Sequence, residues 1–307
     1  RVLERLLEAQ LTEQRKARRG RSLFRLFLAA YLIAILASFL IDSTDSIEFD
    51  GLTHKKHAAV INLEGILLAG TQNDATEVVD ALESAFSDRN SAAVILRINS
   101  PGGSAVQSGI IHDAIRRLRK SHPHIPVYAA LEDLCASGGY YVASAAGSIY
   151  ADKATLVGSI GVIMQSFGVP QLIEKWGIEN RTLTAGEHKA FLDPFQTVRP
   201  EEKAHAQALL NTIHQQFIKS VKEGRGERLK VSDDQLFNGL IWTGEEALRL
   251  GLVDGLASAE SLAREKAGGV PLVDFTKKKD WLSRMSRHFG ETLFNMVVTQ
   301  QKIPQLM

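Results

Sequence analysis

Three segments that read as buried strands are each followed by a turn that contains glycine. The turns are INSPGG at residues 98–103, ASGG at 136–139 and VGSIG at 157–161. Before the first turn, AAVILRIN at residues 92–99 is a nearly continuous apolar run, as expected for a strand buried on both faces. AVQSGIIHDAIRRLRK at residues 105–120 has helical periodicity, and IPVYAALED at residues 125–133 is the next expected strand. Helical segments and strands alternate in this way along the chain. The alternation predicts an α/β fold in which helices flank a mostly parallel sheet.

The overall composition is that of an ordinary globular protein. The 307 residues are 45% hydrophobic with a formal net charge of +1, which does not indicate a nucleic-acid partner. The single cysteine, Cys135, excludes an internal disulfide and a cysteine-based zinc site. We expect this thiol to be buried in the core.

One segment near the start departs from this composition. Residues 23–41, LFRLFLAAYLIAILASFLI, are almost entirely apolar and about long enough to span a bilayer. The basic run RKARRGR at 15–21 precedes them, and acidic residues follow. This asymmetry predicts a single transmembrane helix with the N-terminus in the cytoplasm. The alternative is a cleavable signal peptide, which the long N-terminal region disfavours.

The sequence therefore divides into five expected regions. An amphipathic and basic cytoplasmic segment precedes the transmembrane helix, and a polar linker, one extracytoplasmic domain and an amphipathic C-terminal tail follow it. The tail has apolar residues at helical spacing, including Trp281, Met285 and Phe289. The expected boundaries are 1–22, 23–41, 42–57, 58–270 and 271–307.

The glycine turns are the places where chemistry is expected. Ligands collect at the carboxyl ends of the strands of an open parallel sheet. Two glycine amides beside Ser137 would form an oxyanion hole and a nucleophile for acyl transfer, although each turn alone is more often structural. A nucleophilic serine needs a base, and a histidine triad is disfavoured because no histidine lies within about 25 residues after Ser137.

The order and spacing of INSPGG, ASGGYYVA, VGSIGV and AGEHKAFLDPF resemble the bacterial signal peptide peptidase A family, in its short single-domain form. The resemblance covers about residues 58–260 and implies the fold shared by the Clp protease and the crotonases. It also implies a serine–lysine dyad, with Ser137 as nucleophile and Lys189 as general base. Ser159 would hydrogen-bond the lysine and orient it.

The same resemblance implies an oxyanion hole built from the N–H of Gly138 and that of either Gly102 or Gly103. A free lysine has a pKa of about 10.4, so a lysine base needs an apolar environment that lowers its pKa. Phe191 and its neighbour Leu192 are candidates for such walls. His188, next to Lys189, is an alternative base.

The function that the resemblance implies is a serine endopeptidase, anchored in the bacterial inner membrane, that degrades released signal peptides. The catalytic domain would be periplasmic, and the expected partners are apolar peptides, membrane lipid and further copies of the chain. The family forms closed rings, of which an octamer is one candidate, with each dyad shared between adjacent subunits. No metal or organic cofactor is implied. The alternatives are a crotonase-type acyl-CoA enzyme and a non-catalytic scaffold that binds membrane proteins.

Overall fold

A computed structural model describes residues 55–277 together with Phe27, Ala29 and Tyr31. The chain divides into two compact units, Arg1–Lys55 and Lys56–Met307. In the first unit, Phe27, Ala29 and Tyr31 are helical and exposed. The rest of the predicted transmembrane segment and the predicted C-terminal helix lie outside the described residues. Within the described part of the chain, no helix is long and apolar enough to cross a membrane.

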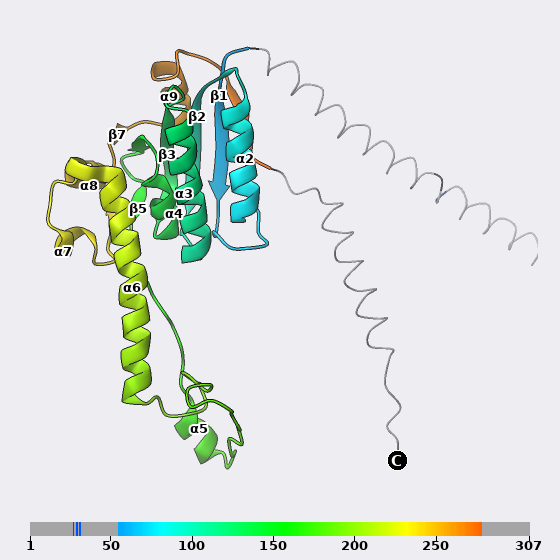
Figure 1. The fold of residues 1–307 in the computed structure, drawn as a ribbon, viewed down its shortest axis with the longest axis vertical. Helices are drawn as coiled ribbons and strands as arrows, with labels where there is room; N and C mark the ends of the chain where they lie inside the picture. The colour runs from blue at the N-terminus through cyan, green and yellow to red at the C-terminus, as the bar shows by residue number, and fades with distance from the viewer. Residues whose placement is uncertain (1–26, 28, 30, 32–54, 278–307) are drawn as a thin grey trace, which may run out of the picture. The chain divides into compact units, whose positions relative to one another are not determined.

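The second unit is built on an eight-stranded sheet (Figure 1). Its main path runs β6-β5-β3-β2-β1-β8, while β4 pairs with β3 and β7 pairs with β4. Every pairing is parallel except that of β5 with β6. The predicted α/β fold with a mostly parallel sheet is therefore confirmed. The strands are β1 His57–Glu64, β2 Ser91–Ser100, β3 Val127–Ala136, β4 Ser148–Ala151, β5 Leu156–Gly158, β6 Ile241–Thr243, β7 Gly255–Leu256 and β8 Leu272–Asp274.

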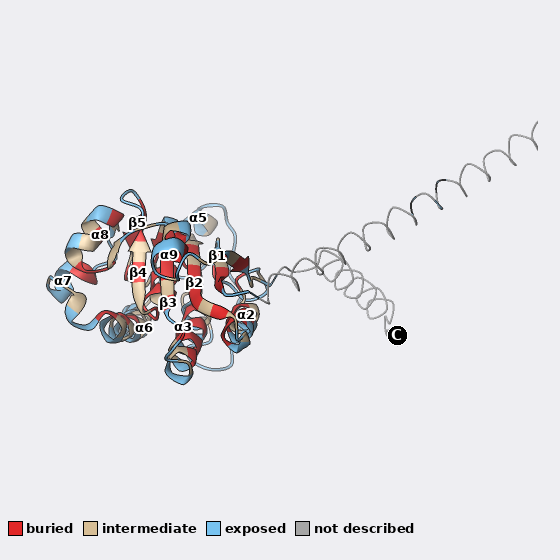
Figure 2. Cartoon of the chain, turned by 90° about the horizontal axis from the view of Figure 1, so that it is seen from above, coloured by how far each residue is buried: buried red, intermediate tan, exposed pale blue. Residues whose placement is uncertain are grey.

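Helices cover both faces of this sheet, as a parallel sheet requires. Alternate residues of β1 and β2 point to opposite faces, so Ile61 and Leu96 pack with the helices α2, α3 and α4, whereas Val60 and Ile95 pack with α9. Figure 2 shows the buried strand residues between these layers. The helices are α2 Ala75–Ser87, α3 Ala105–Ser121, α4 Gly138–Ala143, α5 Pro170–Lys175, α6 Pro200–Arg225, the 3₁₀ turn η1 Gly226–Arg228, α7 Asp233–Leu236, α8 Gly244–Leu250 and α9 Ala259–Glu265.

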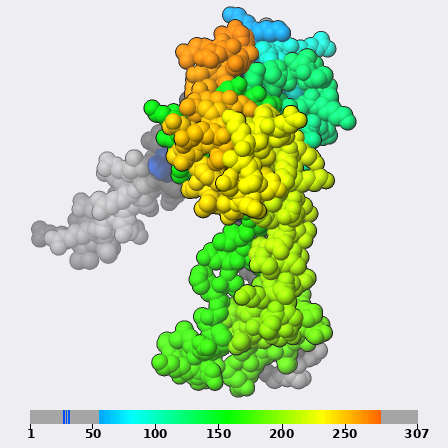
Figure 3. All heavy atoms as spheres, turned by 90° about the vertical axis from the view of Figure 1, so that its left-hand side faces the viewer, coloured from blue at the N-terminus to red at the C-terminus, as the bar shows by residue number. Residues whose placement is uncertain are grey.

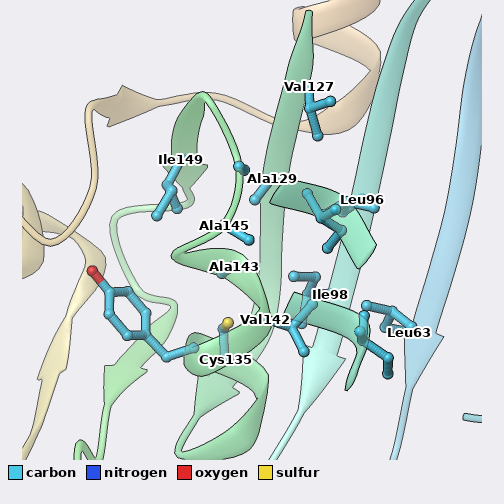
Figure 4. Packing of buried hydrophobic residues seen from close by; sticks show 14 of the residues in the cluster. Leu63, Leu96, Ile98, Val127, Ala129, Cys135, Val142, Ala143, Ala145 and Ile149 are labelled. Carbon is cyan, nitrogen blue, oxygen red and sulfur yellow. The ribbon is translucent and has the colours of Figure 1, made fainter. Parts of the chain in front are cut away.

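The predicted strands and helices up to α6 are present, with shifted ends. The strand that we expected to end at residue 133 continues as β3 to Ala136, because Leu134–Ala136 pair with β5. Cys135 lies in this extension and is completely buried, as predicted. Figure 4 shows its sulfur in the core cluster near Val142. The short strand β8 pairs with β1 although it lies beyond residue 270.

Residues 162–199, here called the arm, differ from the rest of the second unit. The arm contains α5, and none of its residues is buried. It lies beside the N-terminal part of α6, away from the sheet (Figures 1 and 3). Only the second half of α6 packs on the core, through Phe217, Val221 and Arg225 at every fourth position. The first half carries the arm outward.

The C-terminal end of α6 is fixed to the core by a buried ion pair. The Arg225 guanidinium is almost completely buried, and its Nη1 donates to Asp254 Oδ2 over 2.7 Å. Burial alone would raise the pKa of Asp254, but the hydrogen bonds from Arg225 and Ile149 N–H hold that pKa below its ordinary value. Nearby, Tyr140 of α4 donates its hydroxyl proton to the carbonyl of Leu252 over 2.7 Å. This hydrogen bond ties α4, the short helix that follows Ser137, to the segment around Leu252.

Candidate active site

Ser137 lies in the sharp turn between β3 and α4. Its φ of 51° and ψ of −122° are unfavourable for a residue with a side chain. The turn is held on both sides, because Ser137 N–H donates to the carbonyl of Gly158 over 2.8 Å and its own carbonyl accepts from Tyr141 N–H over 2.9 Å. A strained residue that its surroundings hold in place is typical of a functional site. The extension of β3 brings the serine to the edge where the parallel strands end.

The first two glycine turns are in direct contact. A Cβ on Gly102, whose φ is +94°, would lie 2.5 Å from the backbone nitrogen of Gly138 and 2.9 Å from Ser137 Cβ. A Cβ on Gly138 would collide with Ser108 Oγ. Gly102 therefore requires glycine for close approach and for its backbone conformation, whereas Gly138 requires it for close approach alone. The structure brings the INSPGG and ASGG turns together, as the parallel sheet predicts.

Gly102 and Gly103, between which the sequence did not distinguish an oxyanion donor, have different surroundings. Gly102 N–H donates to Ser100 Oγ over 3.1 Å, and that hydroxyl donates to the carbonyl of Gly65 over 2.6 Å. Gly103 N–H has no hydrogen-bond partner among residues 55–277. Gly103 also lines the same cavity as Gly138 and Ser137, whereas Gly102 does not. The amide that can still accept a new partner is therefore that of Gly103.

The third turn follows β5 on the other side of the serine. Ser159 also has a φ of 51°, and its N–H donates to the carbonyl of Leu240 over 2.7 Å. A Cβ on Gly158, whose φ is +115°, would lie 2.7 Å from the Trp242 ring. Ser159 lines the same cavity as Ser137. The structure thus brings two strained serines to one site from turns that are 22 residues apart.

The cavity has a volume of about 660 Å³, and its wall is mixed, with more apolar than polar surface. Tyr141 of α4 lines it and stacks on Phe217 of α6, with ring centroids 4.8 Å apart. Further apolar lining comes from Val162, Ile163, Ile213 and Phe237. A cavity of this size and character accommodates an apolar side chain next to a polar reacting group.

Behind the cavity, His112 of α3 contacts Tyr141, with ring centroids 5.1 Å apart. It is almost completely buried, and burial lowers the pKa of its imidazole, an effect that the hydrogen bond with Asp113 partly opposes. Burial also raises the pKa of the Cys135 thiol, which keeps that residue protonated. Among residues 55–277 and the three described near the start, no cluster of histidine, cysteine or carboxylate side chains could hold a metal ion.

Lys189 lies in the arm and is exposed. Its N–H donates to the carbonyl of Gly186 over 3.1 Å, and it does not line the cavity of Ser137. His188, the alternative base, is also exposed in the arm. Phe191 is half-buried and contacts the His205 ring edge-on, with centroids 5.6 Å apart. Within one chain, the structure therefore brings together Ser137, Ser159, Gly103 and Gly138 but not Lys189.

The structure adds a residue to the site that the sequence argument missed. His214 of α6 lines the cavity together with Ser137 and donates from Nε2 to the carbonyl of Ile160 over 3.1 Å. The sequence argument considered histidines close after the serine and His188 beside Lys189, whereas α6 approaches from later in the chain. One signal was available, because His214 precedes the buried Phe217 by three residues and so lies on the same helix face.

Comparisons with known proteins agree with the geometry. The family model described as peptidase family S49 matches residues 119–272. The putative protease slr0021 of Synechocystis is 33% identical over 223 residues, which cover 72% of this chain and 76% of that protein. The putative signal peptide peptidase SppA of Enterococcus faecium is 30% identical over 207 residues, which cover 66% of this chain and 59% of that protein.

A longer relative is similar over the same extent of the chain. A Brucella abortus protein named Na(+)/H(+) antiporter NhaA is 43% identical over 214 residues. These residues cover 68% of this chain but only 29% of that protein. The similarity is thus to a part of that relative.

Proposed function

This chain belongs to peptidase family S49, and on that premise we propose that it is a serine peptidase with Ser137 as its nucleophile. The observation that carries the proposal is the strained turn at Ser137, which lies beside two glycine-rich turns and opens onto an apolar cavity. Strain held by the surrounding backbone keeps the hydroxyl in a fixed position at the end of β3. Acyl transfer needs a nucleophile preorganised in this way.

Gly138 and Gly103 are the proposed donors of the oxyanion hole. The first amide of a helix has no partner within the helix, which makes Gly138 N–H available. Gly103 N–H has no partner among the described residues, and both glycines line the cavity. Gly102 has a different proposed role, because its N–H is engaged by Ser100 Oγ. It allows the close approach of the two turns.

In the proposed reaction, Ser137 Oγ attacks the carbonyl carbon of the scissile peptide bond while its proton passes to the neutral amine of Lys189. The two amides stabilise the negative charge on the carbonyl oxygen. The lysine then returns the proton to the leaving amine, the C–N bond breaks and an ester to Ser137 remains. Water, deprotonated by the same lysine, then attacks the ester carbon. The bond to Ser137 Oγ breaks, the lysine returns the proton to Oγ, and the acid product leaves. Ser159 orients the lysine through its hydroxyl.

This mechanism requires a lysine, and none of the described residues that line the cavity of one chain is a lysine. We therefore propose that Lys189 enters the cavity of an adjacent subunit in a closed ring, for which an octamer is one candidate size. The exposed apolar side chains of the arm support this assembly, because Ile163, Phe167, Trp176 and Leu183 are each more than 70% exposed. Such side chains need a covering surface. A head-to-tail contact repeated around a ring supplies one to each arm.

The proposed substrates are released signal peptides and similar apolar segments, bound in extended form next to the cavity. The apolar wall made by Phe217, Phe237 and Ile213 supports this class. The proposed location is the bacterial inner membrane, with residues 23–41 as the anchor and the catalytic domain in the periplasm. The relationship to the Clp protease and crotonase fold remains part of this proposal.

Active-site labelling tests the nucleophile. The full-length protein is treated with a fluorophosphonate, digested and analysed by mass spectrometry. We expect one labelled residue, Ser137, and no labelling in Ser137→Ala. The matched control is Ser159→Ala, which keeps the nucleophile and should still be labelled, at a lower rate. A label on another residue would refute the assignment.

A further inference from the structure

Besides the strand pairing of Gly158, hydrogen bonds from three parts of the chain hold the turn of residues 158–161. Ser137 N–H donates to the carbonyl of Gly158, and Ser159 N–H donates to the carbonyl of Leu240, just before β6. The third bond comes from α6, where His214 Nε2 donates to the carbonyl of Ile160 over 3.1 Å. His214 is the only side chain of the described residues that makes a hydrogen bond to this turn.

The bond from His214 acts on the part of the turn that is under strain. Ser159 has a φ of 51°, which a serine adopts only when its neighbours hold it there. Its own N–H is fixed by Leu240, and the carbonyl of the next residue is fixed by His214. The two bonds therefore hold Ser159 from both sides. Without the second bond, the turn can relax and the hydroxyl can leave the cavity.

The bond also identifies which nitrogen of the His214 ring carries the proton. A nitrogen that bonds to a carbonyl oxygen must carry the proton, so Nε2 is the protonated nitrogen of the neutral ring. That nitrogen cannot accept the proton of Ser137, so a role as general base would have to use Nδ1. Among the described residues, the one hydrogen bond that the imidazole makes is the bond to Ile160, which is a structural contact.

We propose that His214 is a positioning residue, which holds Ser159 in the orientation that the dyad requires by bonding to the carbonyl of Ile160. The inference rests on the proposed peptidase function. It assigns to α6 a contribution to catalysis that does not touch the substrate or the reacting atoms. It also gives a role to the polar side chain that lines the cavity between Ile213 and Phe217.

The test compares two amide substitutions that differ in reach. The amide nitrogen of glutamine occupies a position similar to Nε2, whereas that of asparagine is shorter by one carbon and corresponds to Nδ1. His214→Gln can therefore keep the bond to Ile160, and His214→Asn cannot. Gln215→Asn is the matched control, because it shortens an exposed side chain by one carbon on the same helix.

Cleavage of a fluorogenic leucyl peptide amide by the full-length protein provides the readout. We expect kcat of His214→Asn to fall about tenfold with KM within about twofold, which is the scale of one lost hydrogen bond. His214→Gln and Gln215→Asn should keep kcat within about twofold of the unsubstituted protein. If His214→Asn does not fold, His214→Phe replaces it, since that ring lacks the donor.

Two results would overturn the inference. Unchanged kcat in His214→Asn would mean that the bond to Ile160 does not matter for catalysis. A loss of about a thousandfold in both His214→Gln and His214→Asn would mean that the imidazole itself moves the proton. Failure of the proposed function is distinguishable from both, because the unsubstituted protein would then neither cleave the peptide nor be labelled at Ser137, and the inference would fail with it.

Discussion

The regions that carry Ser137 and Lys189 differ in how deeply their residues are buried and in the contacts that hold their backbone. Ser137 follows a strand in the middle of the sheet, and the residues around it are buried or half-buried. Lys189 lies in the arm, where no residue is buried and leucine at position 183 is 96% exposed. The core holds its backbone through the strand ladder and a buried ion pair, whereas the arm lies alongside the outer half of α6.

The difference in burial matches the different requirements of the nucleophile and of the base. The nucleophile and the oxyanion donors need fixed positions, and a packed sheet supplies them within one chain. The lysine base needs an apolar environment, which the exposed arm of a single chain lacks. In the proposed ring, the neighbouring core provides that environment. In this proposal, Ser137 is already positioned in a single subunit and becomes reactive when assembly supplies the lysine base.

The largest expected effects separate the two halves of the dyad. Ser137→Ala and Lys189→Ala should each reduce kcat/KM by at least about a thousandfold, since either change removes the proton-transfer pair. When the two variants are co-assembled at equal amounts, about a quarter of the sites should pair an intact serine with an intact lysine. Activity per site, measured on rings of confirmed composition, checks this value.

A dyad contained in one chain gives a different result. No mixture of the two variants would then contain a complete pair. Mixed rings that recover no turnover would therefore refute the shared site and leave Ser137 as the nucleophile. The same experiment with Ser137→Ala alone, diluted into unsubstituted protein, measures whether inactive subunits impair their neighbours.

Two leucines compare the core with the arm. Leu96 of β2 is completely buried, and Leu96→Ala should lower the free energy of unfolding by about 2–5 kcal/mol. Leu183→Ala should change the free energy of unfolding of the domain by less than about 0.5 kcal/mol, because its side chain is exposed. Urea unfolding measures both. If Leu183→Ala instead weakens the assembly in sedimentation experiments, the arm packs on a neighbour.

Alanine substitutions at two glycines compare how tightly the backbone is packed in the core and in the arm. Gly102 and Gly186 have φ values of +94° and +104°, so alanine is strained at both. A Cβ at Gly102 would also lie 2.5 Å from Gly138 N, whereas nothing lies within 4 Å of one at Gly186. We expect Gly102→Ala to cost about 1–3 kcal/mol more than Gly186→Ala in urea unfolding. Equal costs would mean that the two turns are not in contact.

The smallest effect concerns pH. Burial lowers the pKa of His112, so the unfolded chain takes up this proton at a higher pH, near 6.5, than the folded chain does. The stability from His112 is therefore complete above about pH 6.5 and is lost as the pH falls towards the lower folded pKa. His112→Phe, which keeps a ring against Tyr141, should make the free energy of unfolding depend less on pH between about 5 and 7.

The control for this prediction is His188→Phe in the arm, where the histidine is exposed. It should leave the pH dependence of unfolding unchanged. A pH dependence that His112→Phe does not alter would show that the folded core accepts the imidazolium form as readily as the unfolded chain.

Much of the core was readable from the sequence because its signals are local. The apolar run at residues 92–99 and the periodic segment at 105–120 became β2 and α3 with ends shifted by one residue. The shortest strands were not predicted, because they form only through pairing with other strands. The strands β5 and β6 are three residues each and form because they pair with each other and, for β5, with the extended end of β3. No local pattern encodes such a pairing.

The meeting of Ser137, Gly102, Gly103 and Gly138 could be predicted from the sequence, because glycine turns after parallel strands lie at one edge of the sheet. Which amide is unoccupied could not be predicted, since the hydrogen bond from Gly102 to Ser100 Oγ depends on the conformation of the turn. The position of His214 at the cavity, and of Lys189 outside it in one chain, likewise follows from the folded structure. Both outcomes depend on the path of α6, whose packing brings residues 77 positions apart to one cavity and carries the arm away from it.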